Sequence, residues 1–103
     1  MPYILRHKET GEIAASLQKN HYDLVYYGVK LWNSEKEALE EREPYLEAEC
    51  FPEPDRWETL LVREERAKLM NVKLKNDPAR RVYMDAGGVL TVQADEGPQE
   101  TVS

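Results

Sequence analysis

The two histidines and the single cysteine of this 103-residue sequence are the residues best suited to nucleophilic or metal chemistry. A zinc site needs three or four clustered His, Cys or carboxylate ligands, and neither His7 nor His21 has such a partner at a short spacing. Cys50 is surrounded by acidic residues that oppose thiolate formation. Gly87 and Gly88 lack the spacing and the lysine of a phosphate-binding loop. We therefore expect no metal site, no cofactor and no enzymatic activity.

Charge divides the middle of the chain into an acidic and a basic segment. Residues 34–55 contain nine acidic and two basic side chains, which gives a net charge of −7. Residues 56–81 contain eight basic and four acidic side chains, which gives +4. A cluster of one sign produces a local field that attracts a partner of the opposite sign, although many charge runs are only solvated faces. Each segment is a candidate contact surface.

The acidic segment predicts an amphipathic helix. Ser34 followed by Glu37 forms a capping box, which marks a helix N-terminus. Four apolar residues then share one side of the helix: Ala38, Leu39, Tyr45 and Leu46. Five acids share the other side and are the first candidates for binding a basic protein partner: Glu37, Glu40, Glu41, Glu43 and Glu47. Pro44 lies on the acidic side, where it must either kink the helix or end it at Glu43.

An aromatic stretch before this helix is the second candidate surface. Tyr22–Trp32 is dense in aromatic and β-branched residues and predicts a strand, interrupted at Gly28. Because side chains alternate along a strand, Tyr26 and Tyr27 cannot both face the core. Exposed tyrosine is favoured at interfaces, since it combines a large apolar ring with a polar tip. Tyr26 and Tyr27 are therefore candidate partner-binding residues.

The basic segment suggests an alternative function, which is binding of nucleic acid through residues 63–81. Five side chains would contact phosphates: Arg63, Arg66, Lys73, Arg80 and Arg81. A nucleic-acid-binding domain normally adds aromatic stacking platforms and a positive overall charge, whereas this chain has a net charge of −6. The same bases could instead pair with acids of residues 34–55, at about 0–1 kcal/mol for each surface pair.

Turn signals predict two hairpins. Tyr3–His7 and Ile13–Leu17 read as strands joined by a turn in which Gly11 takes positive φ. Val82–Met84 and Val89–Val92 flank a second glycine-containing turn. Residues 56–75 leave two alternatives open.

One alternative is a single helix, which helix propensity and a capping-box-like start at Asp55 favour. The other is a pair of strands, Trp57–Val62 and Ala67–Leu74, joined by a charged quartet that contains no Gly, Asn or Pro.

These elements predict one α+β domain over residues 1–94, with about four or five antiparallel strands packed against one or two amphipathic helices, and a disordered tail over 95–103. No apolar run approaches the roughly 18 residues of a membrane span. The N-terminal segment lacks the apolar stretch of a signal peptide, and the unpaired Cys50 suits a reducing compartment, so we expect a cytoplasmic protein. The leading hypothesis is a small, acidic, non-enzymatic interaction protein that binds a basic protein surface. A stoichiometric inhibitor or adaptor acting on a nucleic-acid-handling enzyme, of bacterial or phage origin, fits this composition.

Overall fold

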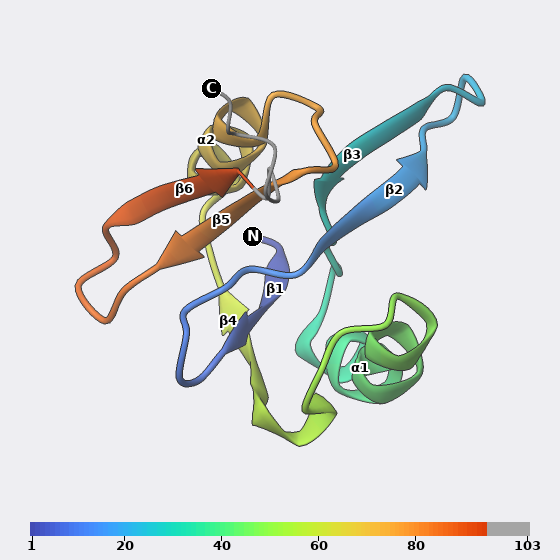
Figure 1. Cartoon of the computed structure of the whole chain (residues 1–103). Helices are drawn as coiled ribbons and strands as arrows, with labels where there is room; N and C mark the ends of the chain where they lie inside the picture. Colours follow the sequence, from blue (N-terminus) through green and yellow to red (C-terminus); the bar gives the residue numbers. More distant parts are fainter. Residues whose placement is uncertain (95–103) are drawn as a thin grey trace.

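A computed structural model describes residues 1–94, and the segment for which we expected a disordered tail lies outside the described residues. The described chain contains, in order, β1 (Tyr3–His7), β2 (Ala15–Lys19), β3 (Val25–Val29), α1 (Glu35–Ala48), a short 3-10 helix η1 (Pro54–Arg56), β4 (Trp57–Leu61), α2 (Glu64–Leu74), β5 (Arg80–Met84) and β6 (Leu90–Ala94) (Figure 1). The predicted α+β class with antiparallel strands is confirmed, but the strands form three two-stranded sheets. No helix within residues 1–94 is long and apolar enough to cross a membrane.

The segment Gly11–Ala14 joins the three strand pairs, which are β1–β4, β2–β3 and β5–β6. It lies between β1 and β5 and bonds to both, then continues directly into β2. Four backbone hydrogen bonds of 2.8–3.0 Å make these connections: Ala14 N–H to Leu5 O, His7 N–H to Glu12 O, Ile13 N–H to Val82 O and Met84 N–H to Gly11 O. Gly11 has φ +82°, and a Cβ there would lie 2.6 Å from the carbonyl oxygen of Met84, so glycine is required at this crossing.

The first predicted hairpin is only partly correct. Its turn is present, because Gly11 N–H donates to His7 O at 2.9 Å. Beyond the bridge between Arg6 and Ile13, however, the chain leaves β1, and β2 pairs with β3. β1 takes β4 as its partner instead. The second predicted hairpin is confirmed as β5–β6.

Residues 56–75 combine the two alternatives that the sequence left open. The first part is strand β4 and the second part is helix α2, so each alternative is wrong for one half. β4 is extended because it pairs along its whole length with β1, and its Trp57 is fully buried. The charged quartet begins α2 rather than turning between strands, and Glu64 and Glu65 occupy the first helical turn, where the positive end of the helix dipole favours acids.

The predicted start of the acidic helix agrees with α1. Ser34 Oγ accepts a hydrogen bond from Glu37 N–H at 3.2 Å, and the helix begins at Glu35. Pro44 lies inside α1, which continues past it to Ala48, so the helix does not end at Glu43. Leu39 was expected on the buried side but is 52% exposed.

Two hydrophobic clusters form the core on opposite sides of β1. Ile4 belongs to a cluster that includes Met70 and Leu74 of α2, whereas Leu5 belongs to a cluster that includes Leu46 of α1 and Trp57. Successive side chains of a strand point to opposite faces, so β1 separates the two helices. The β2–β3 hairpin extends away from this body (Figure 1).

Candidate functional site

The outward face of α1 carries most of the predicted partner-binding acids. Four glutamates are exposed there, three or four residues apart: Glu37, Glu40, Glu43 and Glu47. The ion pairs within residues 1–94 all involve other parts of the fold, so these four carboxylates have no basic partner there. Glu41 is different, because its Oε1 accepts a hydrogen bond from Trp32 Nε1–H at 2.8 Å. This bond fastens α1 to Trp32, which lies three residues before the first residue of the helix.

The two candidate tyrosines lie in different surroundings. Tyr27 is 8% exposed, and its hydroxyl donates to Arg80 O at 2.9 Å, so it belongs to the core. Tyr26 is half-buried, and its hydroxyl lies 3.3 Å from Gln18 Oε1. Of the pair, Tyr26 therefore offers more surface to a partner. Tyr22, which is not among the predicted partner-binding residues, is 72% exposed in the turn of the β2–β3 hairpin.

The five candidate phosphate-binding residues do not form one patch. Arg63 precedes α2 and Lys73 lies in its last turn, which separates them by about 15 Å along the helix. Arg80 Nε donates to Lys73 O at 3.0 Å, and an Arg66 guanidinium nitrogen donates to Gly88 O. Arg81 Nε lies 3.8 Å from Glu12 Oε2. Three of the five guanidinium or ammonium groups are thus engaged within the protein.

A cleft of about 420 Å³ lies between the β2–β3 hairpin, the chain that follows α1 and the start of β5. Its apolar walls include Leu17, Tyr27, Phe51 and Pro78, and its charged groups are Glu12, Glu49 and Arg81. Burial raises the pKa of the Glu12 carboxyl, and the positive charge of Arg81 opposes this rise. Arg81 also interacts with the Tyr27 hydroxyl, so its guanidinium group serves both Tyr27 and Glu12. Glu49 is exposed and has no basic partner within residues 1–94.

One wall of this region is held by a buried hydroxyl pair. Tyr45 of α1 donates its hydroxyl proton to Ser16 Oγ of β2 at 2.8 Å, and Ser16 is buried. Burial raises the pKa of the Tyr45 hydroxyl well above its ordinary range, so this group stays protonated and remains a donor. The bond fixes the end of α1 against β2.

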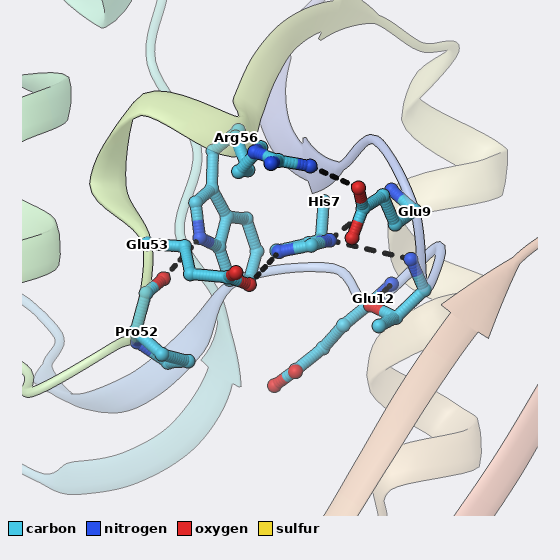
Figure 2. Close-up of polar contacts among 8 residues, drawn as sticks. His7, Glu9, Glu12, Pro52, Glu53 and Arg56 are labelled. Carbon is cyan, nitrogen blue, oxygen red and sulfur yellow. Dashed lines mark hydrogen bonds and ion pairs between the residues drawn. The ribbon is translucent and has the colours of Figure 1, made fainter.

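A histidine–carboxylate pair lies close to Glu12 (Figure 2). His7 is 3% exposed, and its Nε2 lies 3.0 Å from Glu53 Oε1. Its Nδ1 accepts hydrogen bonds from the backbone N–H groups of Glu9 and Thr10, both at 3.2 Å, so the proton of the neutral ring is on Nε2 and is donated to Glu53. Both ring nitrogens are therefore occupied, and the pair has no free nitrogen with which to act as a general base.

This pair fixes the turn after β1 to the chain before η1. The sequence does not reveal this pair, because Glu53 is distant from His7 along the chain and no spacing signal connects them. Within residues 1–94, no group of three His, Cys, Asp or Glu residues could hold a metal ion. Cys50 is exposed at the rim of the cleft.

Comparison of the chain with protein-family models, with curated proteins and with solved structures finds no match. The surfaces described above are therefore the basis for assigning a function.

Proposed function

We propose that this protein is a small non-enzymatic interaction protein that binds a basic protein surface through the outward face of α1. The observation that carries this proposal is the set of four exposed glutamates on that face, none of which has a basic partner within residues 1–94. Fourteen helical residues extend over about 21 Å, which suits a row of positive charges on a partner. Complementary charge of this kind speeds encounter and selects the partner.

The spacing of these acids argues against a purely structural role. Like charges three or four residues apart on a helix disfavour it by about 0.2–0.5 kcal/mol per pair. The pairs Glu37–Glu40, Glu40–Glu43 and Glu43–Glu47 all have this spacing. Lys36, which is exposed four residues before Glu40, offsets part of this repulsion by a similar amount. A basic partner would relieve the repulsion upon binding.

The function that suits these features is that of a stoichiometric inhibitor or of an adaptor protein. A helix with evenly spaced carboxylates carries the same sign of charge as a phosphate backbone. It can therefore bind in a basic groove that normally holds nucleic acid. An enzyme that handles nucleic acid is therefore the kind of partner we propose, in the cytoplasm of a bacterium or of a phage-infected cell. The nucleic-acid-binding alternative has less support, because its candidate bases are divided between the ends of α2 and β5.

The test compares two charge-matched double variants. Glu40→Gln with Glu47→Gln removes two charges from the centre of the α1 face, and Glu64→Gln with Glu65→Gln removes two exposed charges from the first turn of α2. The three proteins are immobilised, incubated with lysate of the organism that encodes the chain and eluted with a salt gradient. A basic protein should elute at lower salt from the α1 variant than from the wild type or the α2 variant.

Elution of the bound protein at the same salt concentration from both variants would show that the outward face of α1 does not contact the partner. The alternative function is checked by gel shift with duplex and single-stranded DNA at low salt. Retention of either DNA that weakens steeply with salt would favour nucleic-acid binding instead.

A further inference from the structure

The two outer edges of the β2–β3 hairpin differ in how their backbone groups are satisfied. The ladder is bounded by the bond from Asn20 N–H to Leu24 O at 3.0 Å and by the bond from Lys30 N–H to Ala14 O at 3.1 Å. Hydrogen-bonded pairs alternate with non-bonded pairs in an antiparallel ladder, so the even-numbered residues of β2 bond to β3. The odd-numbered residues of both strands direct their N–H and C=O groups outward.

Side chains of α2 and of the following turn cover the outer edge of β3. Asn71 Oδ1 accepts a hydrogen bond from Val29 N–H at 2.8 Å, and Asn76 Oδ1 accepts one from Tyr27 N–H at 2.6 Å. These two amide oxygens occupy the positions that carbonyls of a neighbouring strand would take. Pairing of another chain with this edge is therefore blocked.

The outer edge of β2 has no such cover. Within residues 1–94, no hydrogen bond is made by the outward backbone groups of Ala15, Leu17 or Lys19. Leu17 and Lys19 are exposed, and Ala15 and Leu17 line the cleft. An unpaired strand edge is a template for a further strand, and proteins normally protect such edges. The protection of β3 beside the open edge of β2 marks β2 as an edge that is available for pairing.

The cleft beside β2 suits the side chains of an added strand. A neighbouring strand lies about 4.8 Å away, and alternate side chains of it would point into the cleft. Phe51 and Pro78 provide apolar wall, and Glu49 supplies the charge that no base within residues 1–94 compensates. A lysine or arginine combines an apolar stem for these walls with a cation for Glu49.

We propose that the edge of β2 binds an extended segment of the basic partner, which adds as a third strand to the β2–β3 hairpin and directs a lysine or arginine toward Glu49. This inference rests on the proposed function and adds a second, backbone-mediated contact to it. Addition of a strand to a sheet edge gives affinity through main-chain bonds and selectivity through alternate side chains. A second copy of the chain fits less well, because each copy has a net charge of −6 and the copies repel each other.

The test uses a synthetic peptide as the probe. The peptide is a heptamer of alternating lysine and valine with blocked ends, and its controls are the glutamate–valine heptamer and the lysine–valine heptamer N-methylated at every internal nitrogen. Amide hydrogen exchange of the protein is followed by NMR. At a lysine–valine peptide concentration of about nine times Kd, exchange of the Leu17 and Lys19 amides should slow by about tenfold. Neither control peptide should slow it.

Variants separate this inference from the proposed function of α1. Glu49→Gln should weaken binding of the lysine–valine peptide by about two- to fivefold, and the double variant at Glu64 and Glu65 should leave it unchanged. The lysine–valine peptide should still slow amide exchange at Leu17 and Lys19 in the double variant at Glu40 and Glu47. That result supports binding at the edge of β2, whatever the outcome of the lysate experiment.

Three outcomes would overturn the inference while leaving α1 as the contact. The first is equal binding of the N-methylated peptide, and the second is no change at Leu17 and Lys19. The third is protection of these amides in the free protein that increases with its concentration, which would identify a second copy as the occupant.

Discussion

The bond between Asn71 and β3 allows a direct measurement of how α2 holds the β2–β3 hairpin. Val29 is 2% exposed, and its N–H donates to Asn71 Oδ1 at 2.8 Å. Asn71→Ala removes the acceptor and leaves a buried N–H without a partner, which costs about 1–3 kcal/mol. Alanine has the better helix propensity, by up to about 0.7 kcal/mol, and this offsets part of the loss. We therefore expect the free energy of unfolding to fall by about 1–2 kcal/mol.

Urea unfolding of the wild type and three variants would measure this difference. Asn71→Asp keeps an acceptor oxygen and should retain most of the stability. Val72→Ala changes the adjacent, exposed position and should stay within about 0.5 kcal/mol of the wild type. Amide exchange of Val29 should be faster in Asn71→Ala than in Asn71→Asp. The reasoning would be refuted if Asn71→Ala unfolded at the same urea midpoint as the wild type and its Val29 amide exchanged at the same rate.

Three further predictions concern α1 and the cleft. Ser34→Ala removes the helix cap and should lower stability by about 0.5–2 kcal/mol in a thermal or urea melt, whereas an unchanged melt would contradict the observed cap. Tyr45→Phe leaves the buried Ser16 hydroxyl without its donor and should cost about 1–3 kcal/mol, and adding Ser16→Ala should recover part of that loss in the same assay. Burial raises the pKa of Glu12 above its usual value of 4.5, so the proton-linked stability of this group is present below the unfolded pKa and is lost as pH rises through the folded pKa. Glu12→Gln should therefore gain stability relative to the wild type as pH rises above about 4.5, and urea midpoints that keep a constant difference over this rise would contradict this.

Elements defined by neighbouring residues were predictable from the sequence. The start of α1 follows from Ser34 and Glu37, and the β5–β6 hairpin follows from the turn that contains Gly88, whose φ is +86°. Propensity and turn chemistry act over a few residues, so they identify such elements well. The acidic face of α1 was predictable for the same reason, because helical periodicity determines which side chains share a face.

Features that depend on distant partners were not predictable. β4 is a strand because it pairs with the edge of β1, and no residue near Trp57 indicates that pairing. The His7–Glu53 bond and the capping of Val29 by Asn71 likewise join remote parts of the chain. The burial of Tyr27 depends on such a contact as well, because its hydroxyl donates a hydrogen bond to the carbonyl oxygen of Arg80. Sequence periodicity contains no information on which remote group will meet a given side chain.

The position of Gly11–Ala14 between β1 and β5 has a consequence for the order in which the protein folds. The β2–β3 and β5–β6 hairpins close over short turns, and hairpins of this kind form in about 1–10 μs. The bond from Met84 N–H to Gly11 O instead requires that most of the described chain be closed into a loop before any contact compensates the lost entropy. We therefore expect the pairing of β5 with this segment to be a slow step of folding that follows the local contacts within the two hairpins.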